Sequence, residues 1–273
     1  MKTLKLTIAI FLISIFTFSC SKDENATNPA DGIFRIQQIE FSNDDVHKYT
    51  YNAQNIIETI ITNTTYTKFT YNDAGKLKTI ETRGSSIIGG IENYTYDASG
   101  FKTEQLYTCS TGYKSKTTFT NNSIGLPISV TSYIWNSATN LWVIQTINIL
   151  TNTYNSRNQK IKEAYTDSYS EYIYDAAGNL VEKKDYFKSS NNPYYLSRLY
   201  NFSYDNKKVI IDTPYVTNLH NLTDFKEQQF LPNGNTGGSS VYVLSYEYNE
   251  AGYVTKAFYD GRQYAKYILE QTN

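Results

Sequence analysis

A short motif that recurs along the chain constrains its fold more than any other feature of the sequence. Two aromatic residues at positions i and i+2 are followed at once by Asp or Asn, and three positions later by Gly. The four clear copies read FTYNDAG, YTYDASG, YIYDAAG and YEYNEAG, with turn residues Asn72 and Gly75, Asp97 and Gly100, Asp175 and Gly178, and Asn249 and Gly252. Self-similarity at short steps is typical of a repeat architecture.

Four weaker copies lie between or before these. The glycine position of these copies holds Asn55, Gly125, Asn158 or Lys208. The Asp or Asn positions of all eight copies are Asn52, Asn72, Asp97, Asn122, Asn155, Asp175, Asp205 and Asn249. The copy that ends in Lys208 breaks the glycine pattern, so we expect a different turn there, tightening around Asn206 and Lys207.

Each part of the motif has a physical reason. Aromatics at i and i+2 project from the same face of a strand. Asp or Asn bonds to the backbone ahead of it and begins a turn, and Gly or Asn tolerates the positive φ that such a turn needs. The 27 tyrosines and the abundant Thr and Asn fit short strands joined by tight turns. The sequence therefore predicts an all-β fold: an antiparallel meander of about eight β-hairpin repeats, in a curled or barrel-like sheet.

The unit Tyr-x-Tyr-Asp-x-x-Gly resembles the YD repeat of Rhs and teneurin-type proteins and of short YD-repeat lipoproteins of Bacteroidetes. The resemblance covers residues 49–254, and it implies the hairpin unit. In large Rhs proteins such repeats form a shell around a toxin, but this chain is too short for a closed chamber. It also departs from the family where an arginine usually follows the glycine, because those positions hold Lys76, Phe101, Asn179 and Tyr253.

The N-terminus predicts export. Lys2 and Lys5 precede an apolar run over residues 6–18, which has the length of a secretory segment and is too short for a membrane span. It ends in Ser19 and Cys20, which resembles a lipobox, although Thr17 stands where leucine is usual. We expect residues 1–19 to be a lipoprotein signal peptide and Cys20 to carry a lipid. The alternative is an ordinary signal peptide with an incidental cysteine.

Residues 20–31 are polar and predict a tether, followed by one β-hairpin-repeat domain over residues 32–273. The segment SKDE after Cys20 resembles the acidic export signals of surface lipoproteins of Bacteroidetes, or is simply a solvated linker. The expected location is the outer membrane of the cell envelope, exposed at the surface. The membrane is thus an expected partner through the lipid.

Composition excludes several kinds of function. The formal net charge of −1 gives no electrostatic case for nucleic acid. His47 and His220 lack the spacing of a metal site, and no nucleophile or phosphate-loop motif occurs. Cys109 reads as a buried, inert thiol. We therefore expect no catalytic residues, no metal and no cofactor.

Aromatic side chains outside the repeat are the candidates for ligand binding. Trp135 and Trp142 flank a polar loop in what reads as an extra hairpin, and Tyr194 and Tyr195 follow another loop. Aromatic faces with nearby amides suit sugar rings. The alternative is that both tryptophans pack across the hairpin as a cross-strand pair. Residues 84–90, 191–195 and 233–240 also read as surface loops.

Three hypotheses for function follow. The first is a lipid-anchored scaffold that binds a glycan or protein and is not an enzyme. The second is a surface glycan hydrolase, which requires two carboxylates close together in a groove. The third is an accessory or immunity-type factor of an envelope secretion system, which rests only on the Rhs-like repeat.

Overall fold

The computed structural model describes residues 33–84, 89–188, 193–208 and 220–272, and these form one antiparallel sheet of 18 strands. The first nine strands are β1 (Ile33–Phe41), β2 (Val46–Tyr51), β3 (Ile57–Ile61), β4 (Thr65–Tyr71), β5 (Leu77–Gly84), β6 (Gly90–Tyr96), β7 (Lys102–Cys109), β8 (Lys114–Asn121) and β9 (Pro127–Asn136). The other nine are β10 (Leu141–Tyr154), β11 (Lys160–Ala164), β12 (Ser168–Tyr174), β13 (Leu180–Phe187), β14 (Tyr195–Lys208), β15 (His220–Phe230), β16 (Thr236–Tyr248), β17 (Val254–Tyr259) and β18 (Arg262–Thr272). The predicted all-β meander is confirmed.

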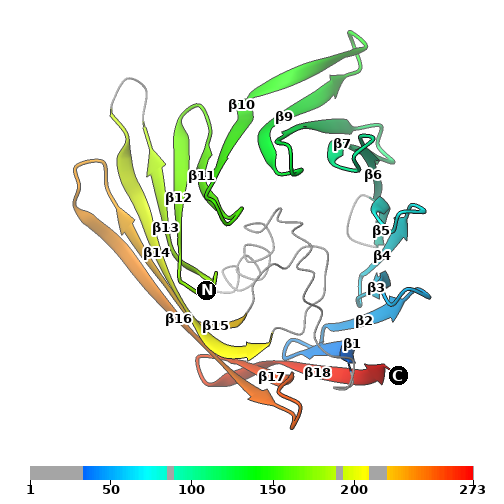
Figure 1. Ribbon diagram of the computed structural model, residues 1–273, viewed down its shortest axis with the longest axis vertical. Coiled ribbons are helices and arrows are strands. Elements are labelled where there is room, and N and C mark those ends of the chain that lie inside the picture. The colour runs from blue at the N-terminus through cyan, green and yellow to red at the C-terminus, as the bar shows by residue number, and fades with distance from the viewer. Residues whose placement is uncertain (1–32, 85–88, 189–192, 209–219, 273) are drawn as a thin grey trace.

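The sheet closes on itself. Each strand pairs with the next along the chain, and β1 pairs with both β2 and β18, from Ile33 opposite Thr272 to Phe41 opposite Ala265. The result is the ring seen in Figure 1, a barrel of consecutive hairpins. Closure removes the open edges that a long meander would otherwise expose. The eight repeats supply β2 to β17, and β1 and β18, which carry no copy of the motif, complete the ring.

The repeat turns share one geometry. In the copy at Asn72, the backbone N–H of this residue donates to the carbonyl of Lys76, and the N–H of Gly75 donates back to Asn72, each at 2.8 Å. The side-chain oxygen of Asn72 also accepts from the N–H groups of Ala74 and Lys76. Gly75 has a φ of +72°, the conformation that the motif predicts. The backbone bonds recur at Asn52, Asp97, Asn122, Asn155, Asp175 and Asn249.

The seven described repeat turns lie at one rim of the ring, because strand direction alternates and each of these turns follows an even-numbered strand. We call this the motif rim and the other end the opposite rim. The motif-rim turns without glycine use Asn55 and Asn158 in its place, with φ of +66° and +62°. Of the predicted loops, residues 137–140 join β9 to β10 at the opposite rim, and residues 85–88 and 191–192 of the other two lie outside the described residues.

A β-bulge follows most of these turns and reverses the side-chain alternation in the returning strand. Tyr71 pairs with Leu77, but Thr70 pairs with Thr79, so Lys78 is an extra residue. The same register shift occurs in six other repeat hairpins. Bulges of this kind bend a strand and increase its twist, which favours closure of a sheet into a ring.

The second aromatic of a repeat ties that repeat to the one before it. The hydroxyl of Tyr71 donates to the carbonyl of Ile57 at 2.7 Å, and that of Tyr96 donates to Leu77 at 2.6 Å. Each acceptor is the first residue of the strand that follows the preceding turn. Further bonds of this kind are Asn121 to Lys102, Tyr154 to Pro127 and Tyr174 to Lys160. The tyrosine of the motif therefore both packs and anchors.

Loss of one such hydroxyl is expected to destabilise the ring measurably. Tyr71→Phe removes the donor to Ile57 and leaves the ring in place, so we expect the free energy of unfolding to fall by about 1 kcal/mol. Urea denaturation measures the change. The matched control is Tyr113→Phe, which alters a tyrosine that is 46% exposed. An equal loss in both variants would contradict the anchoring role.

The buried apolar side chains of the described residues form two clusters. One cluster combines Ile36, Ile39, Val254, Ala257 and Ala265 with partly buried tyrosines. A second cluster contains Ile57, Phe69 and Ile80, again with motif tyrosines packed against it. Among the described residues, no large side chain is less than 2% exposed.

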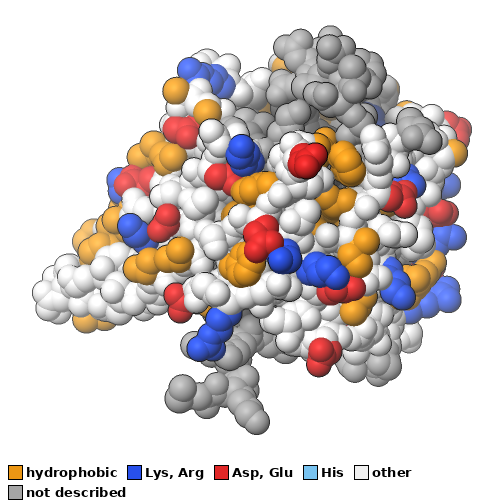
Figure 2. Space-filling model, turned by 90° about the horizontal axis from the view of Figure 1, so that it is seen from below, with side chains coloured by type: hydrophobic (Ala, Val, Ile, Leu, Met, Phe, Trp, Pro, Cys, Tyr) orange, Lys and Arg blue, Asp and Glu red, His pale blue; other side chains and the backbone are white. Residues whose placement is uncertain are grey.

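The outer face carries charges of both signs. Lys256 pairs with Glu247, and Lys266 pairs with Glu40, at 2.7 and 3.1 Å. Arg35 also pairs with Glu270. Figure 2 shows positive and negative side chains interspersed on the face that is seen from below in Figure 1. Alternating charges of this kind are typical of a surface in contact with water.

Two local predictions are wrong and a third is refined. The tryptophan segment forms the predicted hairpin around its polar loop, but its arms are the extended ends of β9 and β10, which also belong to repeats, and add no strands. No turn occurs at Asn206 and Lys207, since β14 continues through Lys208. Residues 236–240 were expected in a loop but belong to β16, where Ser239 and Ser240 pair with β15. In each case a paired neighbour extends the strand beyond what turn-forming residues suggest.

Candidate functional site

The two tryptophans lie together on a hairpin that projects beyond the ring (Figure 1). Trp135 on β9 is directly opposite Trp142 on β10, and their ring centroids are 5.3 Å apart at an angle of 67°. The cross-strand pair is therefore formed. Trp135 is five positions from Val130, the inner-face partner of Phe119, so the pair faces outwards.

Lysines from the neighbouring strand cover these aromatic rings. The ammonium of Lys116 lies 4.9 Å from the ring centroid of Trp142 and 5.2 Å from that of Tyr133. Lys114 lies 5.6 Å from the centroid of Trp135. Such cation–π contacts each stabilise by roughly 0.5–1 kcal/mol at exposed sites. We call Lys114, Lys116, Tyr133, Trp135 and Trp142 the hairpin patch.

The other two predicted residues lie in a separate aromatic group. Tyr194 meets Tyr169 edge-on at 5.1 Å, and Tyr169 stacks on Tyr186 at 4.4 Å. The hydroxyl of Tyr194 donates to the carbonyl of Thr166. Tyr195, which begins β14, is opposite Phe187. The four predicted residues thus divide into two pairs on different hairpins.

The predicted turn residues serve the backbone. Asn72, Asp97, Asp175 and Asn249 accept bonds from the N–H groups of their own turns. At Asp175 the side-chain hydrogen bond from Asn179 lowers the pKa of the carboxyl below its ordinary value. This bond and the turn N–H groups favour the carboxylate.

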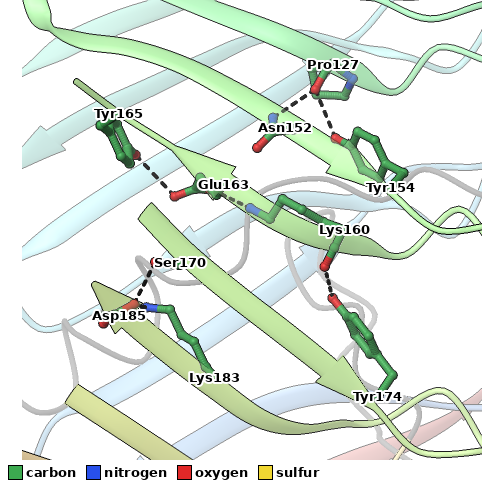
Figure 3. Close-up of polar contacts among 10 residues, drawn as sticks. All are labelled: Pro127, Asn152, Tyr154, Lys160, Glu163, Tyr165, Ser170, Tyr174, Lys183 and Asp185. Atoms are coloured by element: carbon green, nitrogen blue, oxygen red, sulfur yellow. Dashed lines mark hydrogen bonds and ion pairs between the residues drawn. The ribbon is translucent and has the colours of Figure 1, made fainter. Parts of the chain in front are cut away.

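A group of charged and hydroxyl side chains on the inner face was missed by the sequence analysis (Figure 3). Lys160 pairs with Glu163 on β11, and Lys183 pairs with Asp185 on β13 at 3.0 Å. Between them, the hydroxyl of Ser170 on β12 donates to Asp185 at 2.6 Å. The side chains of the two ion pairs are only 13–22% exposed.

Tyrosines border this inner-face group. The hydroxyl of Tyr165 donates to Glu163. Burial, and to a smaller extent the negative charge of Glu163, raises the pKa of Tyr165 to about 12. Burial also raises the pKa of Tyr174 to about 12. Figure 3 shows the nearby bond from Tyr154 to the carbonyl of Pro127.

The inner-face carboxylates Glu163 and Asp185 are a candidate for the pair that the hydrolase hypothesis requires. Glu163 and Asp185 flank Ser170 across three adjacent strands. Each carboxylate is engaged by a lysine, and Asp185 also accepts from Ser170. The arrangement balances charge along the wall.

The β-bulges explain why the group was missed. Leu180 faces inwards, and simple alternation from it would place Glu182 and Lys184 inside. The register shift after Tyr174 instead turns Lys183 and Asp185 to the inner face. A recurring extra residue six positions after each Asp or Asn is a sequence-level rule that would have found them.

Cys109 differs from the prediction of a buried thiol. It is partly exposed at the end of β7, where a tight turn to Tyr113 begins. Its sulfur lies 2.9 Å from the hydroxyl oxygen of Thr111, and this hydrogen bond lowers the pKa of the Cys109 thiol.

The Cys109 thiol is therefore expected to react readily with alkylating reagents. Thr111→Val removes the hydroxyl, so we expect slower alkylation by iodoacetamide at a fixed pH below the thiol pKa and a pH–rate profile shifted upwards. Thr108→Val is the control, since Thr108 lies one position before the cysteine and lacks the sulfur contact. Identical profiles for the Thr111 variant and the unaltered chain would contradict the assignment.

Two further places on the surface, His47 and a polar depression, give weaker support for a functional site. His47 bonds to Asp45 at 3.1 Å and packs edge-on against Phe41. A depression of about 460 Å³ at the motif rim is lined by polar residues that include Arg35, Asn55 and Glu270.

In the described part of the chain, no group of three or more His, Cys, Asp and Glu is placed to hold a metal. No helix among the described residues is long and apolar enough to cross a membrane. Cys20, the signal peptide and the tether lie outside the described residues.

Comparison with known proteins finds similarity in structure only. No family model matches the chain, and no curated protein matches its sequence. A porin-like protein from Bacteroides vulgatus superimposes with a TM-score of 0.43 and 11% identity, over 87% of this chain and 98% of that one. A porin-like protein from Bacteroides uniformis gives a TM-score of 0.42 and 11% identity, over 87% and 95%.

A chain in the crystal structure of TcdB2-TccC3-Cdc42 gives a TM-score of 0.36 and 14% identity over 79% of this chain. The match covers only 10% of the length of that chain. Both groups differ too much from this chain, in sequence and in backbone, to assign it to a family.

Proposed function

We propose that this protein is a lipid-anchored barrel of the cell envelope that binds a ligand through the hairpin patch and has no catalytic role. The observation that carries the proposal is the outward-facing pair Trp135 and Trp142 on a projecting hairpin, with lysine ammonium groups over the rings. The ring itself is the scaffold. Its closed backbone pairing and tyrosine anchors give a rigid support for that hairpin.

The chemistry of the patch suits an acidic glycan or an acidic protein segment. A sugar or apolar side chain would lie on an indole face, while Lys114 and Lys116 would pair with a carboxylate or sulfate. Glu104 is the counter-charge of Lys116, at 3.8 Å, which leaves that lysine able to bind an anion. On the inner wall, Lys160 and Lys183 are each closely paired with a carboxylate, so these two ion pairs fit a structural role.

The charged outer face supports a barrel wall in water, since a lipid-facing wall needs a continuous apolar band. The membrane attachment would then come from the lipid on Cys20 and not from the strands. On this proposal the protein is an outer-membrane lipoprotein displayed at the surface.

The ligand proposal is tested by screening neutral and acidic glycans against the chain from residue 21 onwards. We expect saturable binding of acidic glycans that is lost in Trp135→Ala/Trp142→Ala and kept in Tyr194→Ala/Tyr195→Ala. Circular dichroism verifies that both variants fold. If well-folded protein binds no glycan, the glycan ligand is rejected and an acidic protein partner remains. Binding that depends on the tyrosine pair instead would overturn the assignment to the hairpin patch.

The anchor is tested with the two cysteines of the chain. Expression with radiolabelled palmitate should label the unaltered protein and Cys109→Ser, and both should sediment with membranes. Cys20→Ser should lose the label and be released. Equal labelling of the Cys20 variant would reject the lipid anchor.

A further inference from the structure

The hairpin patch consists of two units that share no residue. In the first unit, the ammonium of Lys114 lies 5.6 Å from the ring centroid of Trp135. In the second unit, the ammonium of Lys116 lies 4.9 Å from the centroid of Trp142 and 5.2 Å from that of Tyr133. Each unit therefore combines one positive charge with at least one aromatic ring.

The two units repeat along the strands. Lys114 and Lys116 are two positions apart on β8, so their side chains project from the same face, with backbones roughly 7 Å apart. Tyr133 and Trp135 have the same spacing on β9, where Tyr133 is directly opposite Lys116. A surface that repeats a cation and a ring along a strand matches a ligand that repeats an anion and a sugar ring.

The patch ends after two units in both directions. Towards the motif rim, the next outward-facing positions hold Glu104, Thr118 and Thr131, which are opposite one another on β7, β8 and β9. This row contains no lysine and no aromatic ring, and its carboxylate would repel an anion. Towards the tip of the hairpin, β8 begins at Lys114 and β9 ends at Asn136, so these strands offer no third unit there.

The charges around the patch leave both lysines able to take an anion. In the described part of the chain, no carboxylate pairs with Lys114, and Lys116 pairs with Glu104 at 3.8 Å. Both side chains of that pair are partly exposed, and such ion pairs contribute little in water. An anionic ligand can therefore displace Glu104 from Lys116.

We propose that the hairpin patch binds two successive sugars of a linear glycan in which every sugar carries a carboxylate, an inference that rests on the ligand proposal above. Each carboxylate would pair with one lysine, and each sugar ring would cover an aromatic ring of the same unit. An acidic peptide would use the lysines but leave the rings uncovered, so the rings favour the glycan. A third sugar would meet Glu104, so longer chains gain nothing further from the patch.

The test is a calorimetric titration of the chain from residue 21 onwards with galacturonate oligomers of one to four sugars. We expect the dimer to bind about tenfold more tightly than the monomer, because its second sugar binds at a high effective concentration. The trimer and tetramer should bind within about threefold of the dimer, since they fill the same two units. The methyl-esterified dimer, which carries no charge, should not bind.

Variants assign the two units. Lys114→Ala and Lys116→Ala should each lower the affinity for the dimer to about that of the monomer. The matched control is Lys162→Ala, because Lys162 also lies over a ring, 4.1 Å from the centroid of Tyr169, but outside the patch. Glu104→Gln should allow the trimer to bind more tightly than the dimer. Circular dichroism verifies that each variant folds.

The outcomes separate this proposal from the ligand proposal. Equal affinities for the monomer and the dimer, with binding still lost in Trp135→Ala/Trp142→Ala, would overturn the two-unit site and leave the ligand proposal intact. A trimer that binds much more tightly than the dimer in the unaltered chain would overturn the boundary at Glu104. If an acidic peptide or another acidic glycan binds and galacturonates do not, the ligand class is rejected. If none of these ligands binds, both proposals fail.

Discussion

Replacement of Phe69 by alanine is expected to lower the free energy of unfolding by about 3–5 kcal/mol. Phe69 is the first aromatic of a repeat and is 4% exposed, packed with Ile57 and Ile80. Truncation removes the buried ring and leaves a cavity between neighbouring hairpins. Urea denaturation followed by circular dichroism gives the change.

The matched control is Phe187→Ala. Phe187 ends β13 close to the opposite rim and is 43% exposed, so its truncation should cost well under half as much. Similar losses in the two variants would show that burial in the repeat lining is not what stabilises the ring.

Raising the pH above 10 is expected to unfold the protein cooperatively. Burial is the largest cause that raises the pKa values of five tyrosines to about 12. They are Tyr49, Tyr154, Tyr165, Tyr174 and Tyr200. In the unfolded chain a tyrosine ionises near pH 10. Between pH 10 and 12 the folded state therefore binds more protons than the unfolded state, and stability falls as the pH rises. Below pH 10 this contribution is fully present.

Phenolate absorbance and circular dichroism, followed together, measure this transition. In native buffer a group of tyrosines should ionise late and together with the loss of β structure, whereas in concentrated urea all tyrosines should ionise near pH 10. Gradual ionisation of every tyrosine near pH 10, with the β signal intact, would contradict the expected burial.

The hairpin repeat was accessible from sequence because its determinants are local. Asn72 and Gly75 specify their turn through bonds within five residues, and Asn55 and Asn158 take the positive φ that the motif requires. The shared face of two aromatics follows from strand geometry alone. The sequence left two interpretations of Trp135 and Trp142 open, a ligand site or a cross-strand pair. The register of β9 and β10 places the two side chains directly opposite each other as a pair.

The features that were missed or left open depend on residues far apart in the sequence or on irregular pairing. Closure requires β1 and β18, whose residues carry no motif. The inner ion pairs depend on bulges, which exchange the faces of Glu182 and Lys183. Cys109 was expected to be buried because its neighbours favour a strand, but it begins a turn that Gly112 permits with a φ of +84°.

The pairing of β1 with β18 also has a consequence for how the chain reaches its native state. Most contacts in the ring join neighbours along the chain, so each hairpin has a short loop to close. The contact of Arg35 with Glu270 joins residues 235 positions apart, and none of the hairpins helps to find it. We expect the order of folding to follow this difference, with hairpins forming early and the first and last strands meeting in the slow step. Before β1 pairs with β18, the sheet has two unpaired edge strands. A chaperone that covers these edges would therefore raise the yield of folded protein.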